Sequence, residues 1–172
     1  MPPDYFEALG LPRSLAIDLK DLEKRFYARS RQLHPDLFAR KSQAERDRAL
    51  EHSAVLNDAY RALKDPIARA MYLLRIEGFD IGEQGSRDVP PELLEEVFEL
   101  NMAIEEADGA QLEASRKRFE ALREGVDGEM FSKFTEWDAS HDKAVLEAIR
   151  GLLNRRKYIT NLIDKTHVSD RV

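Results

Sequence analysis

The chain has 172 residues, of which 42% are hydrophobic and 35% charged, a mixture typical of a folded globular protein and not of a disordered one. It contains no cysteine, which excludes disulfide bonds and removes the thiolates that structural zinc and iron–sulfur clusters usually need. A net charge of −6 makes nucleic acid a poor partner, and the absence of an apolar run that could span a membrane or of a secretion signal leads us to expect a cytoplasmic protein.

The spacing of apolar residues predicts an all-α protein. Apolar side chains recur every three or four residues along the chain, and no segment shows the two-residue alternation of a β-strand. Residues 77–91 contain three glycines and the pair Pro90-Pro91, a composition typical of a linker. We therefore expect a first helical domain over residues 1–76, a linker over 77–91 and a second helical domain over 92–172.

The first domain is predicted to contain two long helices with shorter ones around them. Asp18 can cap a helix that runs to about Leu33, and Pro35 ends it because proline disfavours the helical conformation in the residue before it. A polar connection leads to a helix over residues 42–63, and a short helix over 67–74 follows. Two long helices with a short connection should pack antiparallel.

The helix that begins at Asp18 has two faces of different character. One face is apolar and should point to the core: Leu19, Leu22, Phe26 and Leu33. About 130° around the axis a second face collects three basic residues and an aromatic one: Lys20, Lys24, Tyr27 and Arg31. On the following long helix the expected core side chains are Ala49, Leu56, Tyr60 and Leu63.

The second domain is predicted to be an antiparallel three-helix bundle. Its first helix is expected to open at Asp88 or at Pro90-Pro91 and to end near Asp108-Gly109, and the other two are expected over residues 110–125 and 129–165, with the second break at Asp127-Gly128 and a weak point at Gly151. On the last helix the expected core line is Val145, Ile149, Leu152, Ile159 and Ile163, whereas Tyr158 and Leu162 lie off it.

The tripeptide His34-Pro35-Asp36 lies at the expected tip of the antiparallel hairpin, next to the basic face. A histidine at a helix C-terminus and a proline that stops the helix would explain two of its residues without any function. The tripeptide and its context nevertheless resemble the J-domain family. This resemblance implies docking on a DnaK-type chaperone and stimulation of its ATP hydrolysis, with these chaperone-binding residues: His34, Pro35, Asp36, Lys24, Arg25 and Arg31.

An enzymatic role for the tripeptide has little support. No nucleophile, glycine-rich phosphate loop or set of metal ligands accompanies it, so we expect no catalytic activity and no cofactor. Exposed Lys and Arg would instead steer encounter with an acidic partner surface, an effect that weakens as salt rises. A solvated basic face without function is the alternative.

Two further stretches are similar to the HscB family, the J-domain co-chaperones of iron–sulfur cluster biogenesis. They are residues 56–66 with 68–74, and the start of the chain with Asp4-Tyr5-Phe6. The resemblance implies two partners, the DnaK-type chaperone HscA and the cluster scaffold IscU. Eukaryotic relatives often carry a cysteine-bearing metal module ahead of the J-domain, so this cysteine-free chain resembles the bacterial form and is not expected to hold the cluster itself.

The first helix of the second domain carries two apolar stripes, and one is enough for packing in a bundle. Leu93, Val97, Leu100 and Ile104 form the expected packing face. The second stripe is flanked by glutamates, which suggests a protein-binding patch, unless Leu94 and Phe98 pack against the first domain. The resemblance to HscB implies a scaffold-binding face made of Leu94, Phe98, Glu99, Met102, Glu106 and Tyr158.

Three hypotheses about function follow. The first is an adaptor that binds IscU through the bundle, delivers it to HscA and stimulates the HscA ATPase. The second is a general J-domain co-chaperone for unfolded clients, although the chain has neither a Gly/Phe-rich segment nor a cysteine-rich zinc module. The third is a helical regulator in which the tripeptide is incidental.

Overall fold

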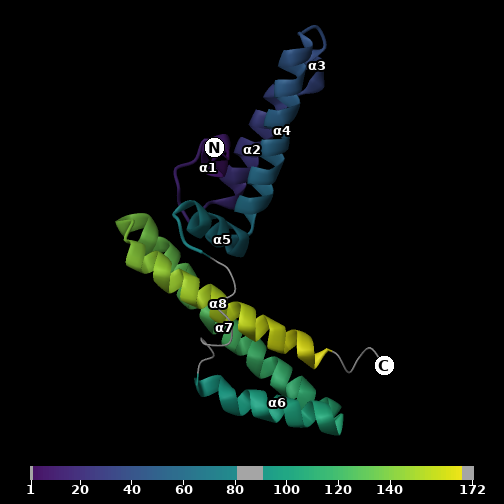
Figure 1. Ribbon diagram of the computed structural model, residues 1–172, viewed down its shortest axis with the longest axis vertical. Helices are drawn as coiled ribbons and strands as arrows, with labels where there is room; N and C mark the ends of the chain where they lie inside the picture. The colour runs from purple at the N-terminus through teal and green to yellow at the C-terminus, as the bar shows by residue number, and fades with distance from the viewer. Residues whose placement is uncertain (1, 81–90, 168–172) are drawn as a thin grey trace. The chain divides into compact units, whose positions relative to one another are not determined.

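The computed structural model describes residues 2–80 and 91–167, and the described part is helical without any strand (Figure 1). The all-α prediction is therefore confirmed. The chain divides into two compact units, Met1–Asp80 and Ile81–Val172. Most of the predicted linker, residues 81–90, lies outside the described residues.

The first unit is an antiparallel hairpin of α2 (Leu19–Gln32) and α4 (Gln43–Lys64), with α1 (Tyr5–Ala8) and α5 (Pro66–Ile76) at its base (Figure 1). The cap that the sequence predicts at Asp18 is present, and a capping box that was not predicted starts the second long helix. The Asp18 carboxylate accepts from the backbone N–H groups of Lys20 and Asp21, and Ser42 and Glu45 form a reciprocal capping box before α4.

The predicted polar connection after α2 is wrong in one respect, because it contains a further helix. Helix α3 (Pro35–Phe38) forms a single turn at the tip of the hairpin. Pro35 stands at its first position, where proline needs no hydrogen-bond donor and has the right φ, and His34 supplies the N-cap.

The core of the first unit runs along the inner sides of α2 and α4. Leu22, Leu56 and Leu63 are buried, and the ring of Phe26 stacks on that of Tyr60 with centroids 4.3 Å apart. Leu19, a predicted core residue, is instead exposed. As the first residue of α2 it lines an open depression with Lys64 at the end of α4 and Pro66 at the start of α5.

Helices α1 and α5 are joined by a pair of stacked aromatic rings and a hydrogen bond between the same two residues. The rings of Tyr5 and Tyr72 stack with centroids 4.6 Å apart, and the Tyr5 N–H donates to the Tyr72 hydroxyl oxygen at 2.9 Å. Arg13 adds ion pairs to Asp4 at 3.2 Å and to Glu77 at 2.9 Å. Burial raises the pKa of Tyr72 above its ordinary value of 10.0, although the bond from Tyr5 acts in the opposite direction.

This raised pKa predicts a loss of stability in alkaline solution. The folded protein holds the Tyr72 proton more tightly than the unfolded chain does. The contribution of this proton to the free energy of unfolding is therefore constant below the ordinary tyrosine pKa and declines as pH rises above it. The free energy of unfolding, measured by urea titration at about pH 8 and about pH 11, should therefore fall less in Tyr72→Phe than in the parent. Tyr27→Phe, at an exposed tyrosine of α2, is the matched control and should behave as the parent. If the free energy of unfolding fell equally between the two pH values in all three proteins, the prediction would be contradicted.

The second unit consists of η2 (Pro91–Leu93), α6 (Leu94–Glu106), α7 (Gly109–Ser140) and α8 (Lys143–Thr166). Helices α7 and α8 run side by side as a long antiparallel pair, and α6 packs against both of them (Figure 1). The predicted three-helix bundle is confirmed. Its core includes Leu100, Phe119, Met130, Ile149 and Ile159.

The predicted helix break at Asp127-Gly128 is wrong, because α7 continues through this pair. A glycine in a helix costs about 1 kcal/mol relative to alanine, whereas burial of one large apolar side chain contributes about 1.5–3 kcal/mol. Val126 and Met130 are both buried on the same face, and Asp127 forms an ion pair with Arg156 of α8 at 2.7 Å. Tertiary packing therefore outweighs the helix-breaking composition.

The turn between α7 and α8 instead lies at His141. This residue adopts the left-handed conformation with φ 52°, and its N–H donates to the Trp137 carbonyl at 2.7 Å. Asp142 then caps α8. Because the turn uses histidine in place of glycine, the usual sequence signal of a helix end is missing.

The predicted burial of two side chains in the second unit is wrong. Ile104 is exposed, and Ala103 takes its place in the packing face of α6. Leu162 is buried, so it does not extend a surface patch. Both α7 and α6 pack against α8, and its buried arc is therefore wider than the single core line that the sequence predicts.

Candidate functional site

His34 shapes the tip of the first unit by capping α3. Its Nδ1 accepts the backbone N–H of Asp36 at 3.2 Å. One carboxylate oxygen of Asp36 lies 3.5 Å from the same Nδ1. The cap therefore orders the backbone that carries Asp36.

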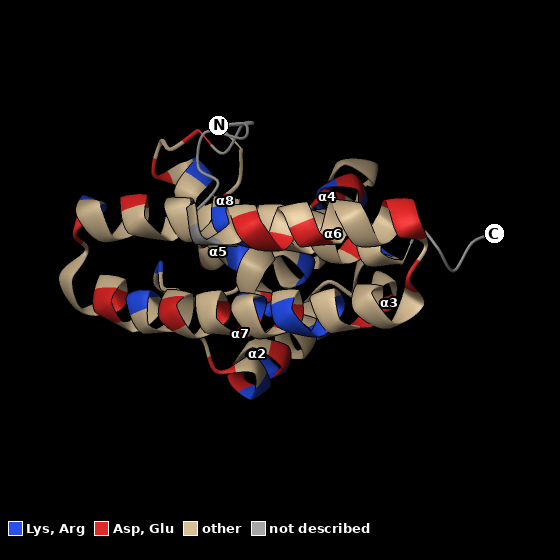
Figure 2. Ribbon diagram, turned by 90° about the horizontal axis from the view of Figure 1, so that it is seen from below, with Lys and Arg blue, Asp and Glu red and all other residues tan. Residues whose placement is uncertain are grey.

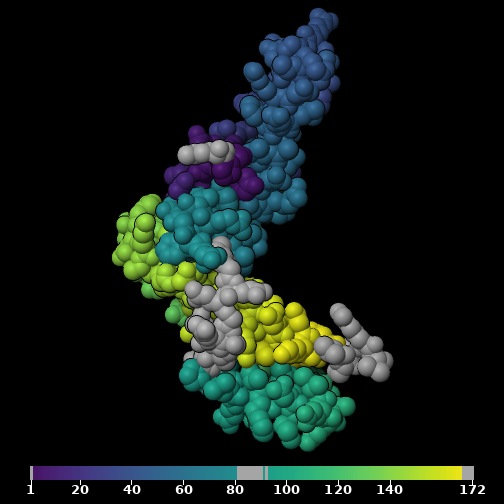
Figure 3. All heavy atoms as spheres, viewed as in Figure 1, coloured from purple at the N-terminus to yellow at the C-terminus, as the bar shows by residue number. Residues whose placement is uncertain are grey.

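Asp36 lies in the first turn of α3 and is open to solvent. Its side chain is 91% exposed, and that of His34 is 59% exposed. Pro35 limits the freedom of the turn because its φ angle is held by the ring. In Figure 3 the atoms around this turn form a narrow end of the first unit. The arrangement can bind a cation on another protein, and it brings no nucleophile to the tip.

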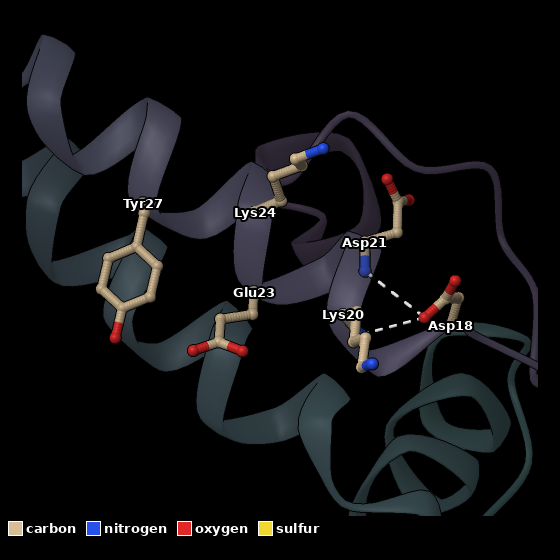
Figure 4. A pocket seen from close by; sticks show the side chains of 6 residues that line it. All are labelled: Asp18, Lys20, Asp21, Glu23, Lys24 and Tyr27. Carbon is tan, nitrogen blue, oxygen red and sulfur yellow. Dashed lines mark hydrogen bonds between the residues drawn. The ribbon is translucent and has the colours of Figure 1, made fainter.

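The outer face of α2 has a mixed charge pattern. Lys20, Lys24 and Tyr27 line a shallow open depression together with Asp18, Asp21 and Glu23 (Figure 4). The Asp18 carboxylate is occupied by the two capping bonds drawn there. Sequence reasoning missed Glu23, although its place between Lys20 and Tyr27 at spacings of three and four residues was a usable signal.

The predicted chaperone-binding residues of α2 fall into two groups. Lys24 and Arg31 are exposed on the outer face. Arg25 is half-buried, and its guanidinium donates to the Asp21 carboxylate and to the Gly10 carbonyl oxygen, each at 2.8 Å. Its bond to the Gly10 carbonyl oxygen holds the turn after α1 in place. Only glycine suits this turn, because Gly10 has φ +66° and a Cβ atom there would lie 2.5 Å from Nη2 of Arg29.

This division predicts different effects of two arginine substitutions. Arg25→Ala should lower the free energy of unfolding by about 1 kcal/mol, because a charge-assisted bond to the backbone is lost, and should lower the melting temperature by about 4–8 °C. Arg31→Ala should leave the melting temperature unchanged and slow association with an acidic partner, more so at low salt. Thermal unfolding and stopped-flow binding at two salt concentrations measure these effects. Equal loss of stability in both variants would contradict the assignment.

The second surface lies on α6, where three large apolar side chains are left outside the bundle core. Leu94 is 59% exposed, Phe98 66% and Met102 39%; we call these residues the α6 stripe. They are spaced by four residues and so share one face of the helix. The sequence-based prediction of a second apolar stripe agrees with this exposure.

The predicted polar neighbours of the α6 stripe differ in their surroundings. Glu99 forms an ion pair with Arg118 of α7 at 2.8 Å, so it also joins two helices of the bundle. Glu106 is exposed in the last turn of α6, and Tyr158 is half-buried on α8. Exposed Ile104 was missed by the sequence analysis because it was assigned to the core.

Within residues 2–80 and 91–167, no three or more His, Cys, Asp and Glu side chains come together in a way that could hold a metal ion. Among the same residues, no helix combines the length and the apolar character that a membrane crossing requires.

Comparison with protein families assigns each unit separately. The DnaJ domain matches residues 4–72, which include the hairpin and its His-Pro-Asp tip. The HSCB C-terminal oligomerisation domain matches residues 89–167, which include the three-helix bundle.

Curated relatives match across both units. The chain is 30% identical to the human iron–sulfur cluster co-chaperone protein HscB over 162 residues, which are 94% of this chain and 66% of the human protein. It is 33% identical to the co-chaperone protein HscB homolog of Burkholderia multivorans over 150 residues, 87% of this chain and 86% of that protein. The chain thus spans about two thirds of the length of the human relative.

Solved structures agree with these matches. The crystal structure of human co-chaperone protein HscB superposes with a TM-score of 0.73 at 28% identity and covers 99% of this chain and 83% of that one. Chaperone HscB from Vibrio cholerae gives a TM-score of 0.66 at 29% identity and covers 96% of both chains.

The hairpin with its capped His-Pro-Asp tip and the matching family model define a J-domain protein, a class that acts as co-chaperones. The matches to the second unit and to relatives along the whole chain are more specific. The chain belongs to the HscB family of iron–sulfur cluster co-chaperones.

Proposed function

We propose that this protein is an adaptor that binds the cluster scaffold IscU through the α6 stripe and stimulates the ATPase of the DnaK-type chaperone HscA through the His-Pro-Asp tip. The observation that carries the proposal is one exposed feature in each unit: the Asp36 carboxylate on the capped turn α3, and an apolar stripe outside the bundle core. We assign residues 1–76 to the J-domain, 77–91 to the linker and 92–172 to the scaffold-binding domain, and we place the protein in the cytoplasm.

The first surface acts on the catalysis of another protein. Lys24 and Arg31 raise the rate of encounter with an acidic surface of HscA. Asp36 then pairs with a cation of the chaperone, and the cap from His34 reduces the ordering cost of that contact because its backbone is already fixed. The chain itself performs no bond-making step.

The second surface recognises the scaffold by burial of apolar area. Leu94 and Phe98 are the residues with most area to bury, and Met102 continues the stripe by one turn. Glu106 and Tyr158 contribute at the border of the face, and Glu99 does so while it keeps α6 attached to α7. Such a polar rim around an apolar centre is usual in protein interfaces.

Steady-state ATP hydrolysis by HscA tests the proposal. We expect the full chain to increase the rate, and we expect the increase to be greater when IscU is also present, because one adaptor then delivers the cargo and the trigger together. A general DnaK-type chaperone with an unfolded client is the control. Stimulation of that chaperone alone would favour a general co-chaperone, and no effect on either ATPase would contradict the proposal.

A further inference from the structure

We propose that Met102 is a site of reversible oxidation by hydrogen peroxide, and that formation of its sulfoxide releases the partner bound at the α6 stripe. The inference rests on the proposed function of that stripe. It adds a chemical means of control to a protein that has no cysteine.

The structure separates the methionines of its described part by their access to solvent. Met102 is 39% exposed on α6 and Met71 is 36% exposed on α5, whereas Met130 is completely buried in the core of the second unit. An oxidant must reach the thioether sulfur, so Met102 and Met71 should react and Met130 should be protected. Of the two accessible methionines, only Met102 belongs to a proposed docking surface.

Oxidation would change the property that the α6 stripe depends on. Met102 follows Phe98 by one helical turn on the same face, so its side chain would be buried when a partner covers the stripe. A sulfoxide is polar, and burying its oxygen without a hydrogen-bond partner is unfavourable. Binding should therefore weaken although the fold of the bundle is unchanged.

The charge around Met102 favours a neutral oxidant. Helix α6 contains five glutamates and neither lysine nor arginine, and Figure 2 shows its acidic residues in red. Only Glu99 among them has an arginine partner in the ion pairs that the structure gives for α6. The resulting negative potential repels anions such as hypochlorite and leaves uncharged hydrogen peroxide unaffected.

The reaction is a balanced two-electron transfer. The sulfur lone pair of Met102 attacks one oxygen of hydrogen peroxide, and the O–O bond breaks to release hydroxide. The hydroxide takes the proton from the new S–OH group, which leaves the sulfoxide and one water molecule. The sulfur is oxidised by two electrons and the peroxide is reduced by two. Methionine sulfoxide reductases reverse the change, which makes it suitable for regulation.

Site-resolved oxidation of the full chain tests the first half of the proposal. Trypsin cleaves after Lys and Arg and so places Met71, Met102 and Met130 in different peptides. After peroxide treatment, mass spectrometry should show sulfoxide at Met102 and Met71 and little at Met130. Protection of Met102 from peroxide would overturn the proposed site chemistry.

Binding of purified IscU to the same samples tests the second half. The parent protein and Met71→Leu should lose affinity on the order of tenfold after peroxide. Methionine sulfoxide reductases for both sulfoxide epimers, supplied with a dithiol as the two-electron reductant, should restore it. Met102→Leu is compared only with itself, and its affinity should be equal before and after peroxide. Affinity that survives complete oxidation of Met102 would overturn the inference alone. Failure of the untreated parent to bind IscU would overturn the proposed function as well.

Discussion

Replacing His34 with Gln is expected to remove most of the stimulation of HscA ATP hydrolysis and to leave the affinity for IscU unchanged. Glutamine is not a favoured N-cap, so α3 loses the bond between Nδ1 and the Asp36 N–H, and the turn that presents Asp36 loses its order. We expect stimulation to fall at least about tenfold, as for a central interface residue. The rate of ATP hydrolysis at saturating IscU and the IscU dissociation constant are the two measurements.

A matched control is available in the same unit. His52 is exposed on α4, and His52→Gln should retain full stimulation. His34→Asn supplies a side chain that caps helices well, so it should keep more stimulation than His34→Gln if the cap is the contribution of His34. Full activity of His34→Gln, or loss of IscU binding in a folded His34→Gln protein, would contradict the two-surface proposal.

Replacing Leu94 and Phe98 together with Ala should have the opposite effect. The double variant removes the two most exposed side chains of the α6 stripe, and we expect its affinity for IscU to fall about a hundredfold, because large apolar anchors dominate binding at interface centres. Stimulation of HscA in the absence of IscU should be unchanged. Isothermal titration with IscU and the ATPase assay provide the two readouts.

The control for this pair is another exposed aromatic residue of the second unit. Phe131 of α7 is 44% exposed, and Phe131→Ala should bind IscU as the parent does. Thermal unfolding of the double variant distinguishes docking from internal packing. If Leu94 and Phe98 packed against the first domain, as the alternative interpretation holds, the substitution would lower the melting temperature and leave IscU binding intact.

The hairpin of the first unit was predictable because its signals are local. Asp18 and Ser42 cap the helices that follow them, and the contacts of each cap span only a few residues. Pro35 marks the end of α2 for the same reason. The capped turn of α3 was not predicted, because neither propensity nor periodicity identifies a helix of a single turn.

The second unit shows where local signals fail. Gly125 and Gly128 suggested a break that packing of Val126 and Met130 overrides, and the true turn uses His141, which carries no breaker signal. Leu162 was assigned to the surface because the width of the buried arc on α8 depends on how many helices cover it. That number is a property of the assembled bundle.

By itself, the sequence determined the helical class, the two-domain order, the His-Pro-Asp tip and the second apolar stripe on α6. Each of these follows from residues within one or two helical turns of one another. Periodicity and capping depend only on residues that are this close in the sequence, so they reveal such features. Only the tertiary structure decided that Arg25 holds the turn at Gly10, that Glu99 pairs with Arg118 and that α7 continues to Ser140. These features depend on contacts between segments separated along the chain, and the free energy of such contacts exceeds the local preferences that a sequence displays.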